Sequence, residues 1–135
     1  EDICQEYLWK LLLDGTSPVE FSSLGRWWGT DPSTRRQEEI DIMGEQDNKT
    51  ALFGECKWRQ EPVDVGVLET LVNRSRLFHY SKVELYLFAK IGFTSGCMEQ
   101  AEQMGNVHLV TYQDILNALQ PEKNNAKKEG TLWRP

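Results

Sequence analysis

The segment KVELYLFAKI at residues 82–91 constrains the fold of this chain more than any other part of the sequence. It is dense in leucine, aromatic and β-branched residues, which is typical of a strand buried on both sides. Helical patterns flank it. Residues 65–78 place apolar side chains on one helical face, and residues 94–104 begin with the capping candidates Thr94 and Ser95. Strands that alternate with helices in this way indicate a sheet with helices packed against it.

The remaining segments extend the sheet and supply two more helices. Residues 1–13 predict an amphipathic helix that ends at Asp14-Gly15. Strand patterns follow at 21–28, at 38–43 and 51–57 as a hairpin, and at 107–112, with a last helix at 112–119. The sequence therefore predicts an α/β domain with a mixed central β-sheet flanked by helices, in the order α-β-β-β-α-β-α-β-α.

Length and composition bound the domain organisation. The 135 residues have room for one domain, which we assign to residues 1–120, followed by a polar, lysine-rich C-terminal tail at 121–135. Because Glu1 already lies within a helical pattern, we expect the chain to be the end of a longer protein. No apolar run approaches about eighteen residues and no signal segment opens the chain, so we expect a cytoplasmic protein without membrane contact.

The three cysteines, Cys4, Cys56 and Cys97, are far apart in the sequence and form no CxxC pair. An odd number of widely spaced cysteines favours reduced thiols over a disulfide framework or a zinc site.

One group of charged residues carries the chemistry. Side chains alternate along a strand, so Glu55 and Lys57 project to one side while Cys56 points to the other. Asp41 lies on the partner strand of the hairpin, close enough to share a metal ion with Glu55. Carboxylate oxygens suit Mg²⁺ or Mn²⁺, and such an ion polarises a phosphate and lowers the pKa of bound water. A cation such as Lys57 orients the attacking water or neutralises charge that develops on phosphoryl oxygens. The group predicts metal-dependent phosphodiester hydrolysis.

The net charge of −6 is unusual for an enzyme that acts on nucleic acid, because phosphates attract basic surfaces. The excess of acids lies mainly at the start: residues 1–25 carry five acids and one lysine, whereas residues 26–90 carry eleven acids and ten Lys or Arg. The middle of the chain is therefore nearly neutral. Tight DNA binding by this chain alone is not what the charge predicts.

The motifs EID at residues 39–41 and GECK at 54–57 resemble those of the PD-(D/E)XK nuclease superfamily, which includes restriction endonucleases and Holliday-junction resolvases. The resemblance covers roughly residues 1–112 and implies a core of helix, three-strand meander, helix and strand. It also implies a Glu on the first helix as a further metal ligand. The spacing places that Glu at Glu1, with Glu6 as the alternative, and makes Gln60 a candidate accessory residue.

GRWWG, EIDIM and FGECKW together resemble more closely the uncharacterised nuclease-like domain at the C-terminus of archaeal- and bacterial-type P-loop ATPases. This resemblance implies a linked ATPase domain as partner. ATP would bind in that domain, since these residues contain no GxxxxGKS or GxxxxGKT loop. The linked domain would also supply DNA affinity that the charge of this chain does not predict.

Several residues are candidates for contacts with nucleic acid. Arg35, Arg36 and Arg59 suit phosphate oxygens. Trp28 is a candidate for stacking on an unpaired base, because the adjacent Trp27 and Trp28 face opposite sides of a strand.

Two further pairs of charged residues are assigned less direct roles. Arg74 and Arg76 lie two apart on a helix and do not share a face, so at most one faces a substrate. We expect Glu38, at the start of its strand, to be solvated, and Glu39 to be structural or solvent-facing.

Two functions from different classes remain open at this level. The first is hydrolysis of DNA, branched or ended, with Mg²⁺ or Mn²⁺. The second is a non-catalytic nuclease-fold domain that binds nucleic acid or protein and regulates the linked ATPase. The sequence does not separate DNA from RNA as substrate, and it leaves open whether the protein forms oligomers.

Overall fold

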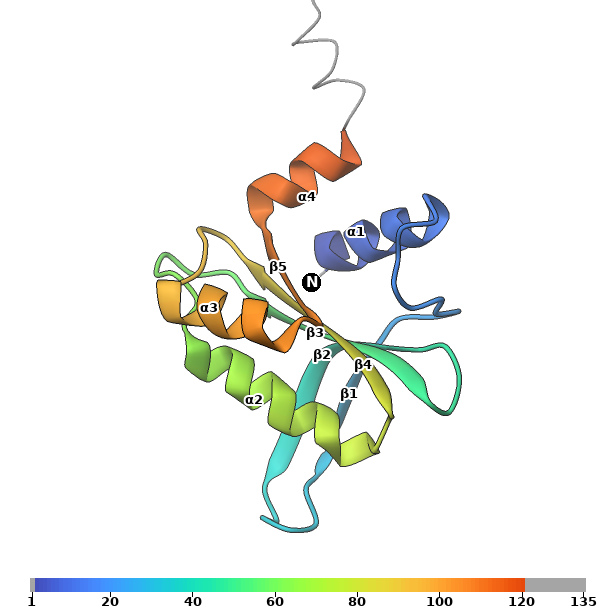
Figure 1. The fold of residues 1–135 in the computed structure, drawn as a ribbon. Helices are drawn as coiled ribbons and strands as arrows, with labels where there is room; N and C mark the ends of the chain where they lie inside the picture. The colour runs from blue at the N-terminus through green and yellow to red at the C-terminus, as the bar shows by residue number, and fades with distance from the viewer. Residues whose placement is uncertain (1, 121–135) are drawn as a thin grey trace, which may run out of the picture.

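Five strands form one mixed sheet at the centre of the protein, which we describe from a computed structural model covering residues 2–120 (Figure 1). The order in the sheet is the order in the chain: β1 (Gly25–Thr30), β2 (Gln37–Glu45), β3 (Thr50–Lys57), β4 (Lys82–Ala89) and β5 (Val107–Thr111). Strands β1, β2 and β3 pair antiparallel, whereas β3, β4 and β5 pair parallel. The predicted mixed sheet is confirmed.

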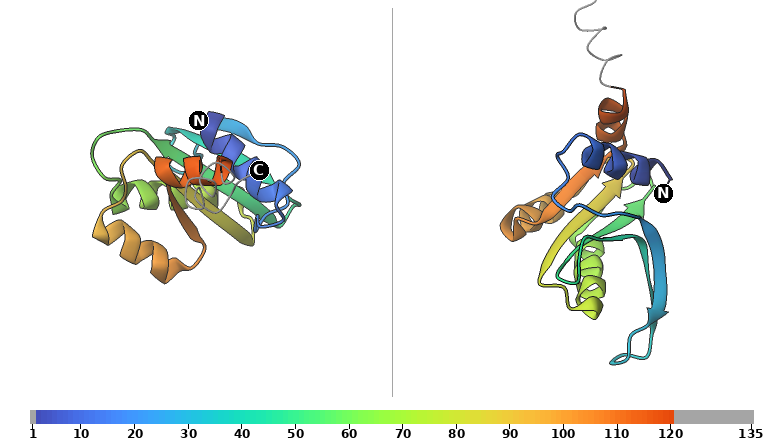
Figure 2. Two further views of the ribbon diagram at one scale, coloured as in Figure 1. Left: turned by 90° about the horizontal axis from the view of Figure 1, so that it is seen from above. Right: turned by 90° about the vertical axis from the view of Figure 1, so that its right-hand side faces the viewer.

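Helices cover both faces of this sheet (Figures 1 and 2). On one face lie α1 (Asp2–Leu13) and α4 (Tyr112–Leu119), and on the other α2 (Val65–Ser75) and α3 (Ser95–Met104), with the 3-10 helix η1 (Arg76–Phe78) after α2. The connections β3–α2–β4 and β4–α3–β5 are parallel crossovers, and their shared hand puts both helices on the same face.

Three helices begin at residues that cap them. The side chains of Asp64, Thr94 and Thr111 each accept a hydrogen bond from a backbone N–H in the first turn of the helix that follows. The capping role predicted for Thr94 is confirmed. These caps fix the residue at which each helix begins. For α2, the cap at Asp64 thereby sets which of its side chains lie beside the end of β3.

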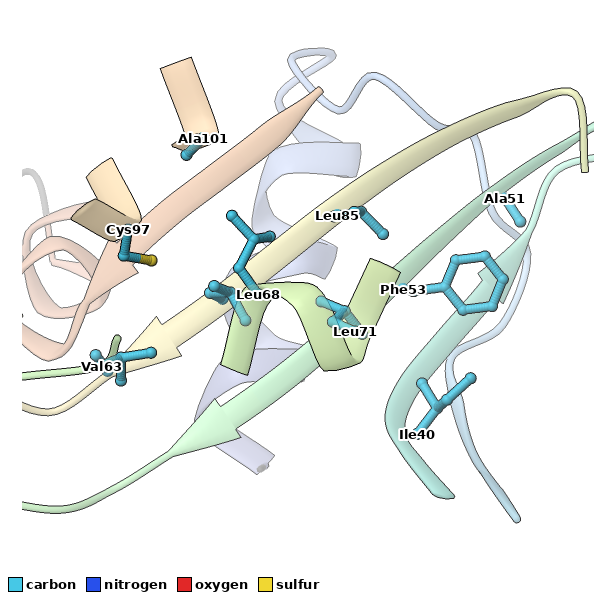
Figure 3. Packing of buried hydrophobic residues seen from close by; sticks show 11 residues of the cluster. Ile40, Ala51, Phe53, Val63, Leu68, Leu71, Leu85, Cys97 and Ala101 are labelled. Carbon is cyan, nitrogen blue, oxygen red and sulfur yellow. The ribbon is translucent and has the colours of Figure 1, made fainter. Parts of the chain in front are cut away.

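Apolar side chains on alternate strand positions form two cores, one on each face of the sheet. On β4, Leu85 (Figure 3) and Leu87 belong to the core on the side of α2 and α3, while Tyr86 and Phe88 belong to the core on the side of α1 and α4. All four are almost fully buried. The prediction that this segment is covered on both sides is therefore confirmed.

The structure corrects some element boundaries. The predicted strand at 21–28 is instead β1 at Gly25–Thr30, because Phe21 leaves the sheet to pack against Trp9 of α1, with ring centroids 4.8 Å apart. The predicted helix at 65–78 becomes 3-10 helix at Arg76. The predicted tail at 121–135 lies outside the described residues. Within residues 2–120, no helix is long and apolar enough to cross a membrane.

Candidate active site

Strands β2 and β3 separate beside Asp41, and this separation makes room for a site. Their backbone pairing extends from Glu45 only as far as Ile42, which faces Gly54. Just beyond it, Asp41 Oδ2 accepts a hydrogen bond of 2.9 Å from the backbone N–H of Cys56. The carboxylate thus satisfies a backbone donor that the strand ladder leaves unpaired. Asp41 is only 7% exposed in this position.

A bulge in β2 aims the Asp41 side chain into this gap. The register of the β1–β2 pair shifts between Gly25 and Trp27, where β2 contains one extra residue. The consequence is visible in the cores: Ile40 packs on the α2 side and Ile42 on the α1 side. Residues two apart in a regular strand would share a face. Asp41, between them, is turned neither fully to one face nor to the other.

Glu55 and Lys57 lie at the end of β3 on the face that α2 covers. Lys57 Nζ lies 3.1 Å from Glu55 Oε1, which agrees with the predicted common side of these two residues. Glu55 is 6% exposed, whereas Lys57 reaches solvent. Both line an open cavity of about 270 Å³, together with Arg59 and the side of α2. Cys56 points the other way, toward the core beneath α1.

Arg74 of α2 joins this cavity to β2. Its Nε lies 2.8 Å from Glu38 Oε2, and its Nη1 lies 3.8 Å from Glu55 Oε2. Of the two arginines that the sequence placed on different helix faces, Arg74 is therefore the one at the site. Glu38, expected in a solvated position, instead holds that arginine beside Glu55.

Arg26 of β1 plays a similar part on the Asp41 side. Its guanidinium lies 2.8 Å from Glu39 Oε1 and 3.9 Å from Asp41 Oδ1. Sequence reasoning did not single out Arg26, which lies in the motif GRWWG. Its place on the strand next to that of Glu39 and Asp41 was the signal that could have identified it.

Burial and a neighbouring carboxylate both affect the pKa of Glu55. Burial, followed by the Asp41 carboxylate, raises the pKa of Glu55 above its ordinary value, although Lys57 and Arg74 act in the opposite direction. Glu55 Oε2 is buried and has no hydrogen-bond partner among residues 2–120. Within the same part of the chain, this buried oxygen has only the ion pair of 3.8 Å to Arg74 Nη1 beside it.

The Cys56 thiol lies on the other face of β3 from Glu55 and is held in its protonated form. A hydrogen bond with Cys4, burial, and the nearby Asp41 carboxylate all raise the pKa of Cys56. Burial also raises the pKa of Cys97. None of the three cysteines, all of which lie within residues 2–120, forms a disulfide, in agreement with the reduced thiols that the sequence predicts.

The other predicted residues lie at different distances from this group. Arg59 lines the cavity of Glu55 and Lys57, and Arg36 lines a neighbouring cavity beside Arg74. Gln60 is exposed in the bend after β3 and lines neither of these two cavities.

Trp28 and Arg35 are not drawn into the group. Trp28 is 69% exposed on the β1–β2 hairpin, whereas Trp27 packs against Phe78, so the two do face opposite sides. Arg35 is exposed in the hairpin loop in a left-handed conformation, with φ of 60°.

The first helix supplies no further ligand within the described residues. Glu1 lies outside them. Glu6, the alternative, is exposed, and it lies two positions from the buried residues Cys4 and Leu8, which places it on the outer side of α1. Within residues 2–120, no three His, Cys, Asp or Glu side chains are arranged to hold one metal ion. The described candidate ligands are thus the two carboxylates of Asp41 and Glu55.

The five-stranded mixed sheet with helices on both faces is similar to the fold of a restriction endonuclease. The structure is similar to that of the DNA modification-dependent restriction endonuclease AspBHI, with a TM-score of 0.51 and 18% identity. The match covers 90% of this chain and 30% of the endonuclease, so the chain spans less than a third of that protein.

A second solved structure, the protein of unknown function AF1548, matches with a TM-score of 0.49 and 18% identity over 86% of this chain and 65% of that one. Residues 1–73 match the family model described as archaeal and bacterial proteins of unknown function, DUF234. The chain belongs to that family. No curated protein sequence matches the chain significantly.

Proposed function

We propose that this chain hydrolyses phosphodiester bonds of DNA with the help of Mg²⁺ or Mn²⁺ bound at Asp41 and Glu55. One observation carries the proposal: Glu55 Oε2 is buried without a hydrogen-bond donor, and the neighbouring Asp41 carboxylate adds to the charge around it. A buried carboxylate oxygen normally has a partner. An exception in a nuclease-like fold marks a position that a cation would complete.

The donor set fits a hard divalent cation. Asp41 and Glu55 offer oxygen atoms, which Mg²⁺ and Mn²⁺ prefer, and no thiol or imidazole competes, since Cys56 points into the opposite core. Glu1, predicted as a further ligand, precedes the described helix α1. When bound, such an ion polarises the phosphate and lowers the pKa of a water molecule.

The residues of this chain would hold and orient the reacting groups. Lys57, on the solvent side of Glu55, is positioned to orient the attacking water or to contact a phosphoryl oxygen. Asp41 is held by the Cys56 backbone, so its second oxygen keeps a fixed direction. Arg74 keeps Glu55 in place before metal binds.

The name of the structural neighbour makes DNA the favoured polymer, because that protein is a DNA modification-dependent restriction endonuclease. A linked P-loop ATPase remains part of the proposal, on the resemblance of GRWWG, EIDIM and FGECKW. Such a domain would add DNA affinity to a chain whose net charge is −6.

Incubation with linear, circular and branched DNA in Mn²⁺ or Mg²⁺ tests the activity. We expect cleavage by the unchanged chain and a loss of at least about a hundredfold in Asp41→Asn and in Lys57→Ala, as for other residues that act at the reacting phosphate. Gln60→Ala, at an exposed position outside the cavity, serves as the matched control. Cleavage that persists in both site variants would refute the proposed site.

A non-catalytic role is the competing function, and the ion pairs favour it. Lys57 and Arg74 both already have acidic partners in the site. Calorimetric titration with Mn²⁺ separates the two functions: binding in the sub-millimolar range that disappears in Asp41→Asn supports the enzyme, and its absence supports a domain that only binds.

A further inference from the structure

The cavity beside Glu55 and Lys57 continues along α2. It adjoins a second cavity of about 330 Å³, and Thr70 and Arg74 line both. The second cavity extends to Arg36, in the loop of the β1–β2 hairpin. We call the two together the α2 groove. It follows one side of the helix from Lys57 at the end of β3 to Arg36 at the hairpin.

The charged side chains of the α2 groove are not equivalent. Its acids already have partners: Asp31 accepts hydrogen bonds from the backbone and hydroxyl of Ser33, and Asp64 caps α2. Arg36 and Arg59, at opposite ends, form no ion pair within residues 2–120. Guanidinium groups without partners, facing an open polar groove, suit phosphate oxygens.

The width of the groove limits what can enter it. At Arg74, one ion pair of 2.8 Å to Glu38 reaches from α2 to β2, so the floor is a single pair of side chains wide. Each cavity has a volume near that of a small-molecule site. From Gly66 to Arg74, α2 rises about 12 Å. That length holds at most about four nucleotides at roughly 3.4 Å each.

We propose that the α2 groove binds an unpaired DNA strand that leads into the site of Asp41, Glu55 and Lys57. The substrate class is therefore DNA with a single-stranded segment, and Arg36 and Arg59 at the two ends, with Arg74 between them, contact its phosphates. The proposal rests on the proposed function, which supplies the reason for a strand to pass Glu55. Because the ion pair of Arg74 and Glu38 bridges α2 and β2, we expect the groove to exclude a duplex.

Two pairs of neighbouring arginines allow a matched test. Arg36 lines the groove and Arg35 does not, while Arg74 lines it and Arg76 lines a separate cavity beside Leu68 and Met104. The variants are Arg36→Ala against Arg35→Ala, and Arg74→Lys against Arg76→Lys. Lysine keeps the charge but removes the planar fork. Thermal melting of each variant shows that it is folded.

Binding is measured by fluorescence anisotropy in Ca²⁺, without Mg²⁺ or Mn²⁺, with a labelled single-stranded oligonucleotide and with its duplex. We expect the single strand to bind more tightly. Arg36→Ala and Arg74→Lys should each weaken that binding about three- to fivefold. Arg35→Ala and Arg76→Lys should change it less than about twofold. Equal losses within each pair, or duplex binding as tight as single-strand binding, would overturn the proposal.

Cleavage in Mn²⁺ is scored separately, so the two proposals fail in different ways. Selective loss of single-strand binding in Arg36→Ala and Arg74→Lys, without any cleavage by the unchanged chain, supports the groove and refutes hydrolysis. Cleavage of both DNA forms, with each arginine pair behaving alike, supports hydrolysis and refutes the groove.

Discussion

At the scale of single residues, Glu55 shows how the candidate site costs stability. Its pKa is raised, first by burial and then by Asp41, so the folded protein holds the proton more tightly than the unfolded chain does. The ionised form therefore destabilises the fold at neutral pH. This cost disappears as the pH falls below 4.5, the ordinary pKa of the group. Carboxylates kept charged against their surroundings are typical of sites that bind cations.

We expect Glu55→Gln to raise the free energy of unfolding at pH 7 by about 0.5–2 kcal/mol in the presence of a chelator. The difference from the unchanged chain should shrink as the pH falls through the raised pKa and below 4.5. Urea unfolding at several pH values measures it. Glu61→Gln, which removes one carboxylate at an exposed position outside the cavity, is the control.

In Mn²⁺, the unchanged chain should have a higher free energy of unfolding than Glu55→Gln, which is the reverse of the order in chelator. An ion that binds only the folded state adds about 2.7 kcal/mol at a hundred times its Kd, and only the chain with Glu55 gains this fully. A Glu55→Gln protein that is less stable at pH 7 without metal would contradict this account of the site.

At the scale of elements, the helix α4 depends on a reciprocal cap. Thr111 Oγ1 accepts from the Asp114 N–H at 3.1 Å, and Asp114 Oδ2 accepts from the Thr111 N–H at 2.9 Å. Thr111→Ala should lower the free energy of unfolding by about 1 kcal/mol, measured in urea. Thr111→Ser keeps the oxygen and should retain most of the stability. Equal losses in both variants would mean that the methyl packing of Thr111 matters more than the cap.

The elements themselves were largely predictable because their signals are local. One short segment is enough to identify the apolar run at 82–91, the helical spacing at 65–78 or the cap at Thr94. The structure has β4, α2 and the start of α3 at these places. The start of β1 was not predictable in this way, because Phe21 packs against Trp9 of α1 and does not belong to the sheet. That contact depends on how α1 packs, which no local pattern contains.

The candidate site was predictable only in part, for the same reason. Glu55 and Lys57 share a side because strands alternate, but the gap at Asp41 depends on a bulge set by pairing with β1. Arg74 meets Glu38 across 36 positions of sequence. Likewise His108 of β5 lies 2.7 Å from Glu84 of β4, 24 positions away in the sequence.

At the scale of the whole molecule, the net charge of −6 limits the affinity for DNA that the proposed groove could supply. The cations of the α2 groove are Lys57, Arg59, Arg74 and Arg36, of which two already pair with acids. Each phosphate contact on a single strand contributes a slope of about −0.7 to the dependence of log K on log salt. Two to four contacts predict a slope between roughly −1.4 and −2.8.

Anisotropy titrations across a range of KCl concentrations measure this slope. Arg36→Ala should make it shallower by about 0.7, because one phosphate contact is lost, while Arg35→Ala should leave it unchanged. A slope much steeper than −2.8 in the unchanged chain would require phosphate contacts outside the α2 groove. A slope within the expected range would mean that a few phosphate contacts carry the affinity of a chain whose net charge is −6, so the loss of any one contact would be measurable.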